Sequence, residues 1–479
     1  MIKSFIWSFL EQGGTKIVQL LVQIVLARLI SPEAFGILAI LLVFTNIADA
    51  IAQSGLGMAL VQKSDATKKD YTTAFWLSLL LATIVFIVLW FIAPVLALVY
   101  QEQSLEVMLH VLSFVVFLNS ANSVQRAYLQ RHMEFKKLFQ ANVVTAVLSG
   151  VFGIGAAILG FGIWALVIQT LAQSLCACIT LLVVVPWKPT FAFDKLSAKH
   201  MYSYGWKICV TGILNVIYTG VSELIIGKAC SVTDLGYYSQ GRKWPNAAIS
   251  LIANALQNVF FPAFASLQND LVALRDTMKK SLIAGSFLIV PVSFFFTAVA
   301  EPMVALLLTE TWLPCVPVFQ SLCIANSLML LQVINLRAYM ALGDSELYMR
   351  LQIIKVTLNV VIIGLAALLT KDIYIVAVVS AVLSVFNVIF IDLHSTKRVH
   401  GYASLSQIKD ILPIYLIAAV AGAVSYAITF LKFSYIAELV LMAIVFVSIY
   451  LLLSVVFKVQ GAKECFQLLN GLLDRKNNN

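Results

Sequence analysis

Polar side chains recur on one face of four long hydrophobic segments of the sequence. In the first of them, polar residues return at steps of three or four, which places them on one face of a helix. The four faces carry Lys16, Gln19 and Gln23; Asn46, Asp49 and Gln53; Lys207, Asn215 and, beside them, Glu223; and Lys243, Asn246 and Asn254. Because amide and charged groups are costly in hydrocarbon, we expect these faces to line a polar cavity.

Basic residues gather near one end of the same segments. If the fourth polar segment begins at Gly236, its Arg242 lies within the membrane. A cationic zone there would attract an anionic group at low dielectric, and arginine offers two parallel donors that suit phosphate. The candidates for contact with such a group are Arg28, Lys228, Arg242, Lys243, Lys207 and Lys16. The alternative for Arg28 and Lys228 is that they lie at span ends and extend to the membrane interface.

Asp49 and Glu223 are the acids that lie deepest in these segments. Each either pairs with Lys207 or another cation as part of the structure, or carries a coupling proton or sodium ion. No histidine clusters with cysteines or acids at metal-ligand spacing, so we predict no metal and no other cofactor. The seven cysteines match no metal or disulfide framework and suit small buried hydrophobic positions.

The amino-acid composition predicts which kind of secondary structure carries these polar side chains. The 479-residue chain is 61% hydrophobic and 11% charged, whereas soluble domains carry about 25% charged residues. Apolar runs of about twenty residues follow one another, which is the length of a membrane-spanning helix. We therefore predict an all-α polytopic membrane protein of about fourteen transmembrane helices. The net charge of +9 fits the excess of lysine and arginine in cytoplasmic segments and predicts no nucleic-acid partner.

The sequence also repeats itself at an interval of about two hundred residues. Residues 27–36 align without gaps on residues 227–236, and the four residues that start at Arg126 recur at Arg337. We predict two parallel six-helix lobes, at residues 1–195 and 200–400, around a central cavity. Two further spans at 411–457 and a cytoplasmic tail at 458–479 complete the chain. Transporters built from such repeats bind substrate between the two halves.

Three motifs resemble the polysaccharide transporter family, the Wzx-type flippases within the multidrug, oligosaccharidyl-lipid and polysaccharide exporter superfamily. They are residues 26–36 (LARLISPEAFG), residues 54–57 (SGLG) with Val61-Gln62, and residues 259–268 (VFFPAFASLQ). The likeness is greatest to exporters of the colanic acid and teichuronic acid kind. It implies translocation of an undecaprenyl-diphosphate-linked oligosaccharide across the bacterial inner membrane by alternating access, for synthesis of cell-surface polysaccharide.

The resemblance implies further partners and a site. Membrane lipids and the polysaccharide polymerase and glycosyltransferases of the same pathway are expected partners. Related flippases for the peptidoglycan lipid precursor keep basic residues in a central cavity for the pyrophosphate. Arg28, Arg242 and Lys243 lie on comparable helices.

Two other function classes remain as alternatives. An ion-coupled drug or cation antiporter of the same superfamily would favour a cavity dominated by acids, whereas cations outnumber acids here. A membrane glycosyltransferase or polysaccharide polymerase would need catalytic residues gathered on a sizeable outer loop, and the connections between the spans are short. We therefore expect a transporter without enzymatic activity.

Overall fold

The computed structural model describes residues 2–461 except 64–65, 192, 395 and 432. Within that part the chain is helical and contains no strand, which confirms the predicted all-α class. Inside the helices, the side chains of residues 2–12 and of several later positions also lie outside the described set. Lys207 and Asn254, both predicted to line a cavity, are among these positions.

Eleven helices in the described residues are long and apolar enough to cross a membrane. A pair bent by 40°, Glu310–Asn326 with Met329–Ala341, raises this number to twelve if it forms one span. The chain is therefore a multi-pass membrane protein, as predicted. The predicted number of fourteen is not confirmed, because the helices at the predicted first and eighth spans fall outside this count.

The chain divides into two compact units, Met1–Ser239 (unit 1) and Gln240–Asn479 (unit 2). Unit 1 contains α1 (Ile2–Leu29), α2 (Pro32–Gln53), α3 (Leu56–Gln62), α4 (Lys68–Tyr100), α5 (Ser104–Arg131), α6 (Phe135–Ile158), α7 (Ile163–Val184) and α8 (Lys195–Ala229). Helix α9 (Val232–Ser266) begins in unit 1 and continues into unit 2. The predicted lobe boundaries stay a prediction.

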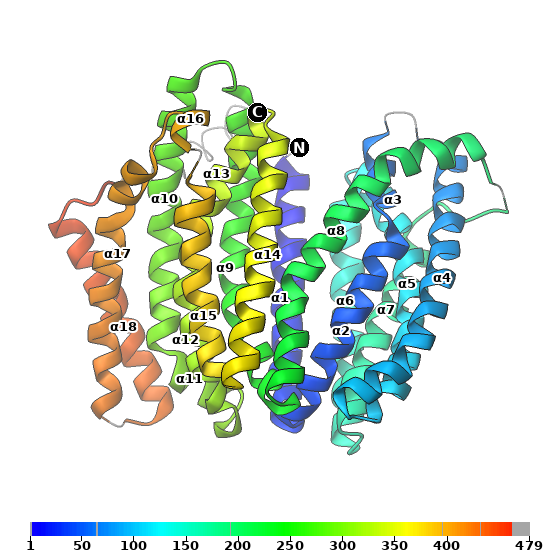
Figure 1. Ribbon diagram of the computed structural model, residues 1–479, viewed down its shortest axis with the longest axis horizontal. Helices are drawn as coiled ribbons and strands as arrows, with labels where there is room; N and C mark the ends of the chain where they lie inside the picture. Colours follow the sequence, from blue (N-terminus) through cyan, green and yellow to red (C-terminus); the bar gives the residue numbers. More distant parts are fainter. Residues whose placement is uncertain (1, 64–65, 192, 395, 432, 462–479) are drawn as a thin grey trace. The chain divides into compact units, whose positions relative to one another are not determined.

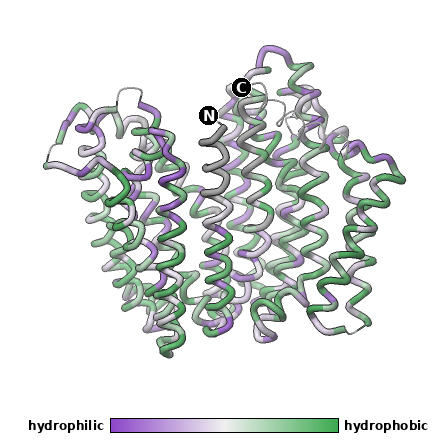
Figure 2. Tube along the Cα trace, turned by 180° about the vertical axis from the view of Figure 1, so that it is seen from behind, coloured by the Kyte–Doolittle hydropathy of each residue, from purple (hydrophilic) through white to green (hydrophobic). Residues whose placement is uncertain are grey.

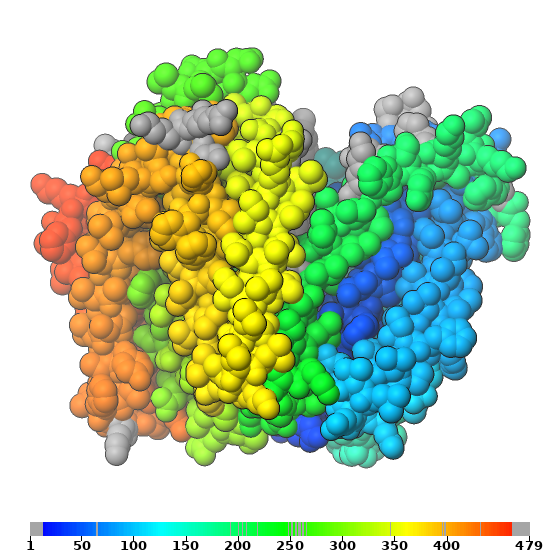
Figure 3. Space-filling view, in the orientation of Figure 1, coloured from blue at the N-terminus to red at the C-terminus, as the bar shows by residue number. Residues whose placement is uncertain are grey.

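The described residues of unit 2 contain twelve further helical elements. The first ten are α10 (Leu271–Ala298), α11 (Ala300–Leu307), the 3-10 helix η1 (Glu310–Cys315), α12 (Val316–Asn326), α13 (Met329–Ala341), α14 (Ser345–Thr370), α15 (Ile373–Phe386), the π-helix η2 (Asn387–Asp392), α16 (Thr396–Val399) and α17 (Ser404–Tyr426). The short η3 (Ala427–Leu431) and α18 (Tyr435–Val456) follow. Helix α10 packs on α12, α13 and α17, while α15 packs on α12 and α14. Figure 3 shows the side chains of α14 and α15 covering one face of this unit.

The long helices of unit 1 form a bundle in which each packs on specific neighbours. Helix α6 packs on α1 and α7, α5 packs on α4 and α7, and α2 packs on α4, α5 and α8 (Figure 1). Hydrophobic residues occupy most of the length of these helices, and hydrophilic residues gather at their ends and connections (Figure 2). This is the distribution that a helix crossing a bilayer requires, because its outer face meets lipid tails.

The helix ends follow the signals in the sequence. Helix α1 ends at Leu29 and α2 begins at Pro32, where the fixed φ of proline suits the first turn and its missing N–H costs nothing. Ser54 and Gly55 then adopt positive φ angles of 43° and 66° and separate α2 from α3. The left-handed backbone of these two residues ends α2 before α3 begins.

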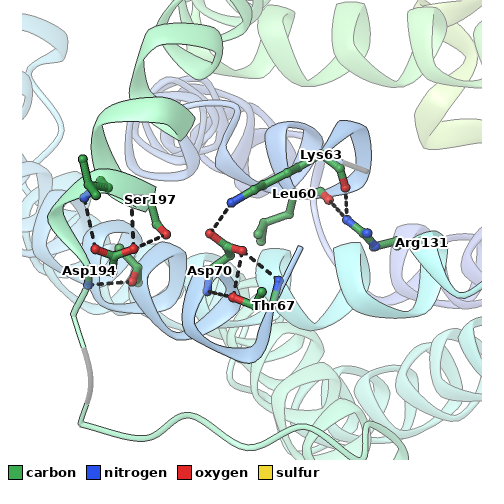
Figure 4. A network of polar contacts seen from close by, with 9 residues as sticks. Leu60, Lys63, Thr67, Asp70, Arg131, Asp194 and Ser197 are labelled. Atoms are coloured by element: carbon green, nitrogen blue, oxygen red, sulfur yellow. Dashed lines mark hydrogen bonds and ion pairs between the residues drawn. The ribbon is translucent and has the colours of Figure 1, made fainter. Parts of the chain in front are cut away.

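A polar network ties together the helix ends on one side of unit 1 (Figure 4). Asp70, 1% exposed, forms an ion pair with Lys63 at 2.7 Å and completes a capping box with Thr67 at the start of α4. Arg131, at the end of α5, donates to the carbonyl of Leu60 at 2.9 Å. Each contact satisfies a backbone or charged group at a helix end, where backbone groups have no hydrogen-bond partner within the helix.

Two glycines at equivalent positions of the sequence repeat bring α2 and α9 into backbone contact. A Cβ added at Gly36 would lie 1.8 Å from the carbonyl oxygen of Val232, and one added at Gly236 would lie 1.9 Å from that of Pro32. Pro32 and Val232 are themselves equivalent in the repeat. The contact is therefore reciprocal, and no side chain fits between the two helices at this point.

We expect Gly36→Ala and Gly236→Ala each to lower the melting temperature of the purified protein, because overpacking typically costs about 1–3 kcal/mol. Gly155→Ala on α6 is the matched control, since a Cβ there meets no atom within 4 Å. That control should hold or raise the melting temperature through better helix propensity. Equal melting temperatures for all three variants would contradict the close contact.

Candidate functional site

A cavity of about 510 Å³ lies inside unit 1, between α1, α2, α5, α6 and α7. Helix α1 packs on α6, while α2 packs on α4 and α5. The cavity lies between α1 and α6 on one side and α2 and α5 on the other. Its polar lining consists of Thr15, Lys16, Gln19, Thr45, Asn46, Asp49, Gln53, Asn119, Asn122, Ser123, Arg126, Asn142, Thr145, Thr170, Gln173 and Ser174. The described lining thus combines many neutral hydrogen-bonding groups with two cations and one acid.

Five of the residues predicted from the polar faces meet in this cavity. They are Lys16 and Gln19 from α1 and Asn46, Asp49 and Gln53 from α2. Each lies at helical spacing from the next on its own helix, so one face of α1 and one face of α2 turn toward the same space. The structure therefore brings the first two predicted faces together within a single unit.

The remaining predicted residues of unit 1 lie apart from this lining. Gln23, one turn beyond Gln19 on α1, donates its Nε2 to Oε1 of Gln169 on α7 at 3.3 Å. Arg28 and Lys228 are exposed, and Lys228 donates to the carbonyl of Val99 at the end of α4. In α8, Asn215 is exposed and Glu223 is partly buried, and the side chain of Lys207 is outside the described set.

In unit 2, Arg242 is partly buried and Lys243 and Asn246 are exposed on α9. The Oδ1 atom of Asn246 accepts a hydrogen bond from Nδ2 of Asn326 at 2.7 Å. The side chain of Asn254 is outside the described set. Because Arg28 and Lys228 belong to unit 1 and Arg242 and Lys243 to unit 2, a cationic zone shared by the four stays a prediction.

Helix α5 supplies a polar face that the four predicted faces do not include. Asn119, Asn122 and Arg126 follow one another at helical spacing and all line the cavity. The sequence singles out Arg126 only through the repeat, and a basic residue near a span end is usually read as an interfacial charge. The step pattern of three and four residues is the signal that would have placed it on the same face as the two asparagines.

Asp49 is the one acid among the described lining residues, and its two oxygens are in different situations. Oδ2 accepts a hydrogen bond from Nδ2 of Asn119 at 2.7 Å. Oδ1 is buried and has no hydrogen-bond partner in the described part of the chain. Buried polar atoms are nearly always hydrogen-bonded. Oδ1 is therefore the atom of this wall that most needs a proton, a cation or a donor from a bound molecule.

Other polar groups of the wall are only partly satisfied by the protein. Nδ2 of Asn122 donates to the carbonyl of Ser174 at 3.1 Å, while its Oδ1 has no partner among described residues. The Thr15 hydroxyl is likewise buried without a described partner. Together with Oδ1 of Asp49, these oxygens can accept hydrogen bonds from hydroxyl groups, and Lys16 and Arg126 can bind an anion.

The described residues contain no group of three or more histidines, cysteines or acids that could hold a metal ion. The polar side chains that line the cavity offer hydrogen bonding and charge recognition. This suits a ligand with many hydroxyl groups and at least one negative charge.

A model of the polysaccharide biosynthesis protein family matches residues 25–317 of the chain. The chain belongs to this family. Among its relatives, the succinoglycan biosynthesis transport protein ExoT of Rhizobium meliloti (strain 1021) is 25% identical over 323 residues, 67% of this chain and 65% of that protein. The teichuronic acid biosynthesis protein TuaB of Bacillus subtilis (strain 168) is 25% identical, with 63% of each chain covered.

The lipopolysaccharide biosynthesis protein WzxC of Escherichia coli (strain K12) is 24% identical over 64% of this chain and 62% of its own length. The matched regions thus span slightly less than two thirds of these three relatives. These likenesses fit the resemblance to the polysaccharide transporter family that the motifs indicate.

Solved structures show the fold. The lipid II flippase MurJ in an inward closed conformation has a TM-score of 0.74 at 15% identity, over 95% of this chain and 99% of that chain. An inward-facing multidrug resistance MATE family transporter has a TM-score of 0.66 at 15% identity, over 82% of this chain and 98% of its own. The chain therefore has the fold shared by these transporters.

Proposed function

We propose that this protein is a flippase that moves undecaprenyl-diphosphate-linked oligosaccharides across the bacterial inner membrane. The observation that carries the proposal is the cavity of unit 1, where Lys16 and Arg126 share a wall with amide and hydroxyl groups. The transporter fold and the family support it, as do relatives named for biosynthesis of succinoglycan, teichuronic acid and lipopolysaccharide. Both termini are cytoplasmic in this proposal.

The two ends of such a substrate need different surroundings. The diphosphate is anionic, and Arg126 can bind one phosphate through two parallel N–H donors while Lys16 supplies a second positive charge. Gln19, Asn46 and Gln53 can exchange hydrogen bonds with sugar hydroxyls, since a carboxamide both donates and accepts. The prenyl chain needs no protein site, because it gains most by staying in the lipid.

Alternating access would carry the bound headgroup from one side of the membrane to the other. The outer cationic residues Arg28, Lys228, Arg242 and Lys243 are then proposed as later contacts for the diphosphate along the same path. Membrane lipids surround the protein, and the polymerase and glycosyltransferases of the pathway are proposed partners that make and consume the substrate.

Asp49 favours a second role for the same cavity, the binding of a coupling ion. Its unpartnered Oδ1 can take up a proton or contact a sodium ion. The same carboxylate is also the feature that a drug or cation antiporter would use. We prefer the flippase because the described lining holds Lys16 and Arg126 against the single acid Asp49, and excess positive charge repels a cationic drug.

The flippase is tested by transport of fluorescent undecaprenyl-diphosphate oligosaccharide in proteoliposomes. We expect Arg126→Met to reduce transport about tenfold or more, because charged hydrogen bonds contribute roughly 1.5–3 kcal/mol and each 1.4 kcal/mol is tenfold. Arg126→Lys should retain part of the activity. Arg242→Ala tests the outer cationic zone separately.

The matched control is Arg337→Met, because Arg337 is the repeat equivalent of Arg126 and lies outside the described lining of this cavity. The transport rate of the Arg337→Met variant should stay within about twofold of that of the unchanged protein. This difference corresponds to a free energy below the ~1 kcal/mol of a typical hydrogen bond. Normal transport by a well-folded Arg126→Met variant would contradict the proposed substrate site. Efflux of a cationic dye in place of lipid transport would favour the antiporter.

The coupling role is tested with Asp49→Asn, which keeps the shape of the side chain and removes its charge. We expect Asp49→Asn to lower transport driven by a tenfold proton or sodium gradient by about tenfold. A tenfold gradient of one coupled ion supplies about 1.4 kcal/mol, and this driving force is lost when the ion no longer binds. Exchange of labelled for unlabelled lipid without a gradient should continue. If gradient-driven transport is unchanged, Asp49 serves only to hold Asn119.

A further inference from the structure

Unit 2 contains an ion pair that is buried completely. Nζ of Lys355 on α14 lies 2.7 Å from Oδ1 of Asp392, the last residue of η2. The side chain of Lys355 is 1% exposed and that of Asp392 is 0% exposed. Both helices belong to segments apolar enough to cross a membrane. An ionisable pair inside such a segment is costly and usually marks a functional site.

The surrounding groups leave the carboxylate of Asp392 incompletely satisfied. The side chain of Gln332 on α13 also interacts with the carboxylate as a hydrogen-bonding group. The Oδ2 atom is nevertheless buried and meets no partner with hydrogen-bond geometry among the described residues. Tyr339 donates its hydroxyl to the backbone carbonyl of Asp392 at 2.8 Å and so does not reach the side chain. Oδ2 is therefore an acceptor that can take a proton without breaking a described hydrogen bond.

The charged and titratable groups around the pair are few. Among described residues, Lys355 and Asp392 are each other's charged partners. The ring of Tyr339 stacks on that of His400 with centroids 5.8 Å apart. Burial lowers the pKa of His400 to about 4, so this histidine is neutral near pH 7. Among the other described charged groups on α13 and α14, Glu346 and Arg350 are exposed and Arg337 is partly buried, as is Asp344 directly before α14.

The backbone next to the pair is unusual. The span that begins as α15 continues as a π-helix from Asn387 to Asp392. Asn387 is 2% exposed, and neither polar atom of its side chain has a described partner. π-Helical segments are rare and occur frequently at functional sites, where the altered turn changes the direction of a side chain. Here an unsatisfied amide and an unsatisfied carboxylate oxygen begin and end one such segment.

A purely structural role does not account for these features. Replacing a buried ion pair by well-packed apolar residues is often neutral or stabilising, because desolvation of the two charges offsets their attraction. The pair therefore gives little net stability over a methionine and a leucine. What it gives is an attraction between α14 and η2 that depends on the charge of Asp392.

We propose that Asp392 is a proton-binding site of unit 2. Lys355 is its counter-ion, and the attraction between the two side chains depends on whether the proton is bound. In the ionised pair, the ammonium and the carboxylate sum to zero charge and hold α14 against η2. A proton that binds Oδ2 gives a neutral carboxylic acid beside an unchanged ammonium, with a net charge of +1. The attraction is then lost, α14 can part from η2, and release of the proton restores the contact.

This proposal goes beyond the cavity of unit 1, and its first test does not depend on transport. Infrared difference spectroscopy of the purified protein between neutral and acid pH detects the carbonyl band of a newly protonated carboxylic acid. We expect one such band to be missing from the variant Lys355→Met/Asp392→Leu. The control variant Glu346→Gln/Arg350→Gln removes an exposed ion pair from the same helix α14 and should keep the band.

The second test measures lipid transport against pH. One coupled proton changes the rate by up to about tenfold per pH unit, and the double variant should lose this dependence while the control keeps it. If the double variant does not fold, the exchanged pair Lys355→Asp/Asp392→Lys replaces it and should retain an acid-induced band. An unchanged band in the double variant, or transport with the original pH dependence, would overturn the proposal. A protein that shows the band but moves no lipid would contradict the flippase and leave the proton site standing.

Discussion

The structure depends on one constraint, the cost of placing polar groups where neither water nor another polar group can reach them. In a chain with 61% hydrophobic residues, each amide or charge inside a spanning helix must meet a partner or a polar space. Unit 1 meets this constraint by turning faces of α1, α2 and α5 toward one cavity. Unit 2 meets it at Lys355 and Asp392 by direct pairing. Both solutions leave an oxygen unsatisfied, on Asp49 and on Asp392.

The packing of unit 1 explains why the cavity lies where it does. At the start of α2, Gly36 allows the backbone to touch the first turns of α9, which still belong to unit 1. Thr45, the first polar lining residue of α2, lies roughly 14 Å farther along the helix at about 1.5 Å per residue. The close backbone contact and the polar space therefore occupy different parts of the same helix.

The sequence predicts the parts of this arrangement that depend on local periodicity. The faces of α1 and α2 are recognisable because Lys16, Gln19, Asn46 and Asp49 stand out against apolar neighbours, and the break at Pro32 follows from the chemistry of proline. The helical class follows from composition. These inferences need no knowledge of which helices are neighbours.

What the sequence does not reveal depends on contacts between distant residues. The face of α5 is hard to recognise because serines and alanines surround Asn119 and Asn122. Gln23 continues the face of α1 in sequence, yet it pairs with Gln169 of α7 instead of lining the cavity. The ion pair of Lys355 with Asp392 joins two helices, and the π-helix that ends at Asp392 has no signature in the residues that form it.

The central claim is that the cavity of unit 1 is wet and holds the headgroup of the substrate. Its most direct test is thiol labelling of single cysteines in a cysteine-free protein, with a charged, water-soluble reagent. Cysteines at Gln19, Asn119 and Thr170 should react and should be protected by undecaprenyl-diphosphate oligosaccharide. Cysteines at the exposed, apolar positions Phe114 and Val151 should not react. Equal reactivity at all five positions, or no protection by the lipid, would contradict the account.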